Sequence, residues 1–226
     1  MANYKVVDAD QLESDLTIVA DAIRERGGTS DQMAFPEGFV SAVDGIPDKM
    51  DEYVSGNLTE YYHATLTNPM NFGFCYCQKL KKAEFPELIN SGYYGFQHTE
   101  ALVELIAPKL EIVGECGLAC SGLKKADFPL LREIHPQGFN WTPVETFILR
   151  RTDVMCTLAN SNGMANTAIA RGTGYIYVPR KFLSDTDSTM DYRQATNWSV
   201  YANQFRALED YTVDGTTTGE LDESKI

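Results

Sequence analysis

Apolar positions in the middle of the chain recur at intervals of 22 and 21 residues. The clearest markers are Pro86, Pro108 and Pro129, each with a leucine six residues before it and another two residues after it. Self-similarity with a period of roughly 20–30 residues is typical of a solenoid, whose stacked coils bury one shared core. The pattern therefore predicts a repeat protein before any single side chain is interpreted.

The same frame extends over five coils. Their first apolar residues are Leu58, Leu80, Leu102, Leu123 and Val144. Three and five positions after each start the residues are again mostly apolar, as expected for the inner face of a short strand. The proline that follows ends the strand, where it costs no ladder hydrogen bond. The residues between the inner positions must point outward, and stacked coils would align them as a row on a narrow parallel sheet.

The first 46 residues follow a helical pattern instead. Leu12, Leu16, Val19 and Ile23 recur at steps of three and four, which predicts an amphipathic helix that ends at a glycine pair. A second short helix is expected from Pro36. Two such helices cannot bury their apolar faces alone. We therefore expect this block to mediate self-association through the four apolar residues of the first helix.

The pattern divides the chain into five segments. These are a helical oligomerisation or attachment module at 1–46, a polar linker at 47–57, the solenoid at 58–183, a cap at 184–210 and an acidic polar tail at 211–226. Trp198, Tyr201 and Phe205 recur at helical spacing, so the cap is expected to be a helix that closes the solenoid. The tail is expected to be extended or disordered. The predicted fold class is an α+β repeat of about five coils with a narrow parallel sheet.

Charge is distributed unevenly along the chain. The formal net charge is −13, with four basic and twelve acidic side chains in residues 1–56 and one basic and six acidic in residues 207–226. Acidic ends around a neutral middle disfavour attraction to nucleic acids or anionic membranes. The N-terminal residues lack the basic start and apolar core of a signal peptide, and no apolar run reaches the roughly 18 residues of a membrane span. We therefore expect neither signal-peptide export nor membrane insertion.

The five cysteines allow two interpretations. They are Cys75, Cys77, Cys116, Cys120 and Cys156. An odd count without a signal peptide does not suggest a disulfide framework. The C-x-C and C-x3-C pairs could supply four ligands to zinc, but the spacing differs from the usual C-x2-C and no histidine is close in sequence. We expect thiols packed as small apolar groups inside the coils, and no bound metal.

The sequence contains no recognisable catalytic motif. The histidines, His63, His98 and His135, occupy different positions of their coils, so they are not expected to meet in one site. Glu84 and Asp127 occupy matching outward positions two coils apart, on the order of 10 Å by the strand spacing. That separation overlaps the carboxylate pair of an inverting glycosidase, but an apolar residue lies between them and no cleft is implied. We predict a non-enzymatic protein without a cofactor.

The repeats resemble the BspA-like leucine-rich repeats. The stretches FGFCYCQKLKKAEFPEL and SGLKKADFPLLREIHPQGF carry the resemblance, together with the endings GTGYIYVPRKFL and YRQATNWSVYANQFRAL. The resemblance covers residues 58–210. The coil that starts at Leu102 departs from the frame, because it has ELIAP where its neighbours have AEFP or ADFP, and the fifth coil lacks the proline. The resemblance implies a short leucine-rich-repeat solenoid.

The stretch DLTIVADAIRERGGTSDQMAFPEGFVSAVDGI resembles a short module in tail and other virion proteins of phages and prophages of gut Firmicutes. Together with the repeats, this resemblance implies a structural protein that assembles onto a virion and recognises a host-surface protein or glycan. The expected partners are further copies of the chain and other virion proteins, and the expected location is the virion, assembled in the bacterial cytoplasm. The alternative is a bacterial cell-surface adhesin with the same repeats, which would need an export signal and an anchor.

The outward strand row is the first candidate for the binding surface. It comprises Glu84, Ile106, Asp127 and Ile148, with Lys82 and Lys125 beside it. The convex arcs that connect the strands are the alternative surface.

Overall fold

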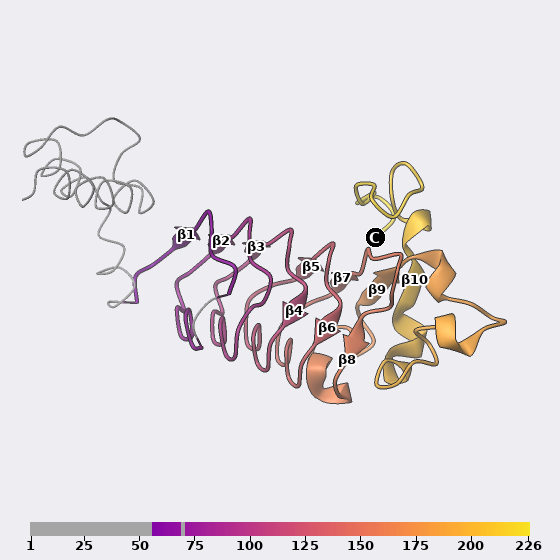
Figure 1. The fold of residues 1–226 in the computed structure, drawn as a ribbon, viewed down its shortest axis with the longest axis horizontal. Helices are drawn as coiled ribbons and strands as arrows, with labels where there is room; N and C mark the ends of the chain where they lie inside the picture. Colours follow the sequence, from indigo (N-terminus) through magenta and orange to yellow (C-terminus); the bar gives the residue numbers. More distant parts are fainter. Residues whose placement is uncertain (1–55, 69–70) are drawn as a thin grey trace, which may run out of the picture. The chain divides into compact units, whose positions relative to one another are not determined.

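The computed structural model describes residues 56–68 and 71–226, which belong to one compact unit. Within this unit the chain winds as stacked coils whose short parallel strands form three sheets (Figure 1). The first sheet holds β1 (Glu60–Tyr62), β2 (Lys82–Glu84) and β3 (Glu104–Ile106). The second holds β5 (Lys125–Asp127), β7 (Thr146–Ile148), β9 (Tyr175–Val178) and β10 (Phe205–Ala207). The third holds β4 (Ile112–Val113), β6 (Glu133–Ile134) and β8 (Thr157–Leu158).

Paired residues on neighbouring strands are separated by the same number of residues as the sequence repeat. Lys82 pairs with Glu104 at a step of 22 residues, and Lys125 pairs with Thr146 at a step of 21. The fifth coil is longer, because Thr146 pairs with Tyr175 and the additional chain includes the 3-10 helix η1 (Ser161–Met164). Each coil therefore adds a strand beside the preceding one, at the roughly 4.8 Å spacing of neighbouring strands.

The arcs between the sheets are also joined from coil to coil by backbone hydrogen bonds. The Tyr76 N–H donates to the Gln97 carbonyl at 2.8 Å, and the His98 N–H donates to the Ala119 carbonyl at 3.1 Å. The same bond recurs at Trp141. These three donors have left-handed backbone, with φ of 63°, 58° and 60°. The arcs thus satisfy these backbone donors through the neighbouring coil.

Close stacking of the coils leaves no space for a side chain at some arc positions. A Cβ atom added at Gly114 would lie 2.3 Å from the Gly92 carbonyl oxygen of the preceding coil. Glycine is therefore required at residue 114 by the distance between coils.

The core runs through the centre of the coils. The apolar residues that start the five coils are all buried, with Leu58, Leu123 and Val144 at 1% exposure or less. From the arc side, Phe74 and Phe96 stack with ring centroids 5.0 Å apart. Identical apolar groups of successive coils therefore lie on one another, and each coil buries its core residues only because its neighbours are present.

The predicted α+β class is wrong. The described residues form three parallel sheets and short 3-10 helices, and they include no α-helix. The 3-10 helices besides η1 are η2 (Arg180–Phe182), η3 (Ser188–Met190), η4 (Ser199–Gln204) and η5 (Leu208–Asp210). The predicted helical module at 1–46, with its contact residues Leu12, Leu16, Val19 and Ile23, lies outside the described residues.

The predicted capping helix at 184–210 is also wrong, although its aromatic residues do close the core. Asn197 has a φ of 63° and Tyr201 leaves the helical region with φ −107° and ψ 17°, so a continuous helix cannot form. Phe205 instead begins β10, which pairs with β9. Trp198, Tyr201 and Phe205 are all buried, and the Trp198 indole N–H donates to the Cys156 carbonyl at 2.8 Å. The aromatic spacing thus predicted the burial of the cap but not its backbone.

No helix among the described residues is long and apolar enough to span a lipid bilayer.

Replacing Leu110 by alanine is expected to destabilise the solenoid by about 2–5 kcal/mol, because this fully buried side chain would leave a cavity between coils. Chemical denaturation of the full chain measures the change. Val103→Ala is the control, since Val103 is 66% exposed and its truncation should cost less than about 0.5 kcal/mol. Equal losses in the two variants would contradict the core described above.

Candidate recognition surfaces

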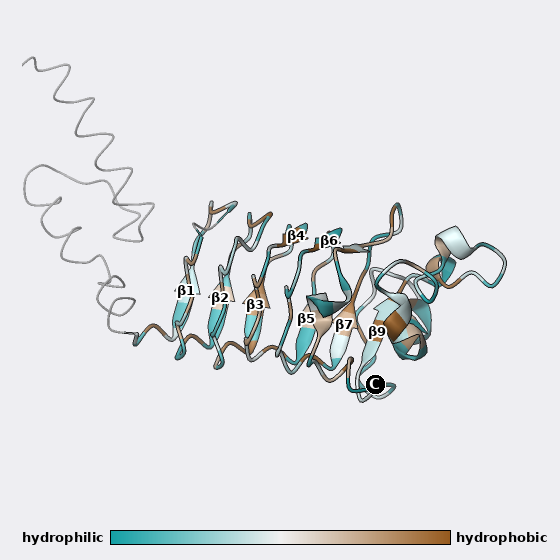
Figure 2. Cartoon of the chain, turned by 90° about the horizontal axis from the view of Figure 1, so that it is seen from below, coloured by the Kyte–Doolittle hydropathy of each residue, from teal (hydrophilic) through white to brown (hydrophobic). Residues whose placement is uncertain are grey.

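The outward face of the first sheet is open and polar. Figure 2 shows hydrophilic colouring along β1 and β2. Lys82 and Glu84 project outward from β2 and are half-buried, and the Lys82 ammonium lies 3.2 Å from the Glu104 carboxylate of the next coil. Ile106 is half-buried on β3, and Tyr62 on β1 is 56% exposed. Glu84 and Ile106 of the predicted row therefore remain accessible on this sheet.

The C-terminal tail covers the outward face of the second sheet. Ile148 on β7 is fully buried in a cluster with Tyr177, Leu208 and Leu221, against which Tyr211 packs. Figure 1 shows the C-terminus beside β7 and β9. The expectation of an extended or disordered tail is therefore wrong. Burial of one apolar side chain, Leu221, holds this otherwise polar segment against the sheet. Ile148 is unavailable to a separate partner.

Arg150 connects the tail to the strand row. Its guanidinium donates to both oxygens of the Asp127 carboxylate at 2.7 Å. It also donates to the carbonyls of Thr217 at 2.8 Å and Gly219 at 2.9 Å. This bidentate, charge-assisted arrangement is stronger than an ordinary surface pair. The Asp127 carboxylate is therefore already engaged, so it does not form a free carboxylate pair with Glu84.

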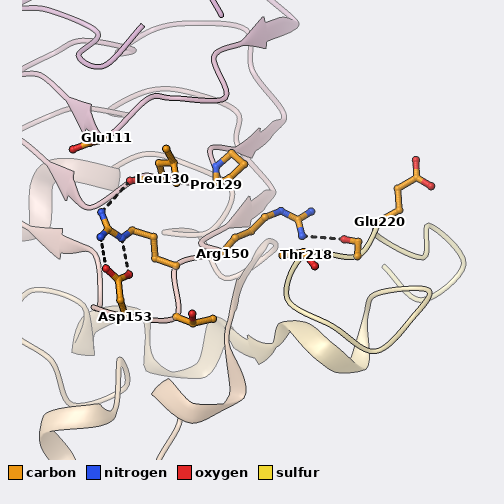
Figure 3. A pocket seen from close by; sticks show the side chains of 10 residues that line it. Glu111, Pro129, Leu130, Arg150, Asp153, Thr218 and Glu220 are labelled. Carbon is orange, nitrogen blue, oxygen red and sulfur yellow. Dashed lines mark hydrogen bonds and ion pairs between the residues drawn. The ribbon is translucent and has the colours of Figure 1, made fainter. Parts of the chain in front are cut away.

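A shallow pocket opens next to this junction (Figure 3). Pro129 and Leu130 line one side, and Thr218 and Glu220 of the tail line the other. Lys125, the remaining residue of the predicted site, forms an ion pair with Glu223 at 3.0 Å. With the Lys82–Glu104 pair, four of the six predicted binding residues have partners within the chain, and the partners of Lys125, Asp127 and Ile148 include residues of the tail or bonded to it.

The arcs that connect the strands carry a second surface, the alternative to the strand row. Two of its positions have left-handed backbone in successive coils. The first row is Phe72, Tyr94, Cys116 and Gln137, and the second is Tyr76, His98, Cys120, Trp141 and Asn166. Tyr76 and Trp141 are 62% and 63% exposed. We call the second row, with the residue that precedes each of its members, the arc platform.

Aromatic rings of neighbouring coils stack on this surface. The Tyr76 and His98 rings lie 4.7 Å apart at an interplanar angle of 11°, and the Phe72 and Tyr94 rings lie 5.1 Å apart at 30°. The pKa of the Tyr94 phenol is raised, mainly by its hydrogen bond with the Cys116 thiol. The Tyr94 phenol therefore stays protonated at neutral pH.

The cysteines do not gather into a metal site in the described part of the chain, where no cluster of three or more cysteine, histidine or acidic groups is placed to hold an ion. Burial, followed by the charge of Cys75, raises the pKa of the Cys77 thiol to about 11. Burial also raises the pKa of Cys120, and all five thiols are free. Protonated thiols are poor nucleophiles and poor metal ligands.

The histidines have separate local partners. The ring of His63 accepts hydrogen bonds at Nδ1 from the N–H groups of Thr65 and Leu66. His98 lies 3.1 Å from the Glu100 carboxylate, and His135 lies 3.0 Å from that of Glu133. Each histidine is thus held by its own arc or strand, and the three do not share a site.

Comparison of the chain with models of protein families, with curated proteins and with solved structures found no match.

Replacing Arg150 by methionine is expected to release the tail and to destabilise the chain by about 1–3 kcal/mol, because Asp127 and two carbonyls lose a charged donor. Amide hydrogen exchange of residues 211–226 should become faster, which mass spectrometry measures directly. Arg151→Met is the matched control, since Arg151 pairs with the exposed Asp153 and should cost less than about 1 kcal/mol. Unchanged exchange in Arg150→Met would show that the apolar cluster alone holds the tail.

Proposed function

We propose that this chain is a non-enzymatic structural protein of a phage or prophage virion, associated with its tail, baseplate or fibre, and that its repeat unit recognises a host or partner surface. The resemblance of the repeats and of the N-terminal stretch to such proteins supports the virion setting. The proposal includes further copies of the chain and other virion proteins as partners, with the block at 1–46 as the attachment point.

The observation that carries the recognition role is the exposed aromatic side chains on the arcs. Exposed large apolar side chains gathered on one face of a soluble protein mark an interaction surface more often than chance exposure does. Aromatic residues also contribute most of the energy in many binding interfaces. The strand face is a weaker candidate, because the tail occupies half of its predicted row.

An antibody against the full chain is expected to label purified phage particles at one defined position, seen by immunogold electron microscopy. Mass spectrometry of the same particles should detect the chain at a stoichiometry that matches its copies in the virion. Preimmune serum provides the control. Labelling of the bacterial envelope, with none on particles, would favour the cell-surface adhesin instead.

Fluorescently labelled chain is expected to bind host cells, and the double variant Tyr76→Asn with Trp141→Asn should reduce that binding about tenfold or more. Asparagine tolerates left-handed backbone, so it removes both rings with little change to the arcs. Tyr62→Asn on β1 is the control, because Tyr62 is an exposed aromatic residue on the strand face. Loss of binding only in the control variant would assign recognition to the strand face.

A further inference from the structure

The aromatic residues of the arc platform are not explained by the backbone conformation that they adopt. Left-handed backbone costs a residue with a side chain on the order of 1–2 kcal/mol, while glycine and asparagine tolerate it far better. The last coil follows this preference with Asn166. The other four coils have Tyr76, His98, Cys120 and Trp141 at the equivalent position, so three of the four are rings. The turn therefore requires the conformation, and something other than the turn accounts for the rings.

Packing within the chain accounts for only part of them. The stacking of Tyr76 on His98 recovers about 0.5–1.5 kcal/mol, as such aromatic pairs do. Trp141 differs, because no ring contact to it is found among the described residues and its side chain is 63% exposed. A tryptophan held in left-handed backbone and presented to solvent gains little from its own fold. Backbone strain of this kind is a mark of functional positions.

The platform combines flat rings with amides. Gln97 precedes His98, and Asn140 precedes Trp141. The Asn166 side-chain nitrogen donates to the Asn140 side-chain oxygen at 3.0 Å, which fixes the orientation of both amides. An amide offers both donors and an acceptor. Hydroxyl groups, which donate and accept, are suitable partners for it.

The ten residues of the platform include no lysine, arginine, aspartate or glutamate. Charged neighbours of both signs contact it: the Glu100 carboxylate lies 3.1 Å from the His98 ring, and the Arg171 guanidinium donates to the Asn166 carbonyl at 2.7 Å. Opposite charges at the border give the platform little long-range selectivity for a polyanion or an acidic peptide. Rings alternating with amides instead match an uncharged sugar, whose C–H groups pack on the electron-rich face of an aromatic ring while its hydroxyls bond to amides.

The coil spacing gives the platform a length. Tyr76 and Trp141 lie three coils apart in the same row, which corresponds to about 14 Å at the spacing of neighbouring strands. His98 and Cys120 occupy the two positions between them in the row. A chain of several sugar units, rather than a monosaccharide, spans that distance.

We propose that the arc platform is a binding site for a neutral oligosaccharide chain, which stacks on Trp141 and on the Tyr76–His98 pair and hydrogen bonds to the amides of Gln97 and Asn140. This site rests on the proposed recognition function and specifies its ligand class.

Intrinsic fluorescence offers a direct test, because the chain has two tryptophans and only Trp141 is exposed. The full chain is titrated with cellohexaose, maltohexaose and chitohexaose. We expect at least one hexasaccharide to change the tryptophan emission saturably. Trp141→Asn should abolish that signal, and in calorimetry it should weaken the binding at least about tenfold, or 1.4 kcal/mol. Tyr62→Asn should bind as the unchanged protein does.

Two results would overturn the proposal: no hexasaccharide binds in fluorescence or calorimetry, or binding is unchanged in Trp141→Asn. The same variants, applied to host cells treated with periodate or with protease, separate this failure from failure of the recognition function. Cell binding that depends on Trp141 but is lost only after protease treatment means a protein ligand, so recognition stands and the sugar site is wrong. Absence of any cell binding removes the recognition function itself.

Discussion

The ladder of backbone hydrogen bonds between consecutive coils is the constraint on which the rest of this structure depends. In the arcs, alternate residues donate their N–H groups to carbonyls of the next coil, as His98 does to Ala119 and Phe96 does to Gly117. The side chains of these donors then separate into two sets. Phe96 points into the core and is fully buried, whereas Tyr94 and His98 have left-handed backbone and face outward. Core and arc surface are therefore two consequences of one backbone arrangement.

The same constraint explains why the ends of the solenoid need different chemistry from its middle. A coil at the end has no neighbour to accept its hydrogen bonds or to cover its core. At the C-terminal end, additional strands and aromatic residues cover the last coil. Strand β10 continues the sheet past β9. Trp198 covers the core, and its indole N–H donates to the Cys156 carbonyl. The tail then covers the outer face of β7 through Leu221.

The sequence was sufficient to predict what depends on the repeat interval, and it failed where tertiary contacts decide. Leu58, Leu80 and Leu102 are at equivalent positions in the repeat and are buried, as the spacing requires. Trp198, Tyr201 and Phe205 have helical spacing but do not form a helix. The same spacing of aromatic residues is compatible with other backbone conformations, and Phe205 pairs with the edge of the sheet at β9 instead. The tail looked unstructured because its single anchoring leucine carries no periodic signal.

The candidate surface was only partly predictable for a related reason. Outward positions on strands follow from alternation, so Glu84 and Ile106 were found, but alternation cannot show that Ile148 is covered by a segment 70 residues later. The arc platform did carry a signal that was open to sequence reading: aromatic residues stand where a tight turn favours glycine or asparagine. The ladder bond is the same at Tyr76, His98 and Trp141 although their side chains differ, so we expect asparagine, which the last coil has at this position, to be tolerated in place of Trp141. Left-handed backbone is costly for these aromatic residues, and the fold does not need their rings. A ligand that stacks on the rings explains them better than the fold does.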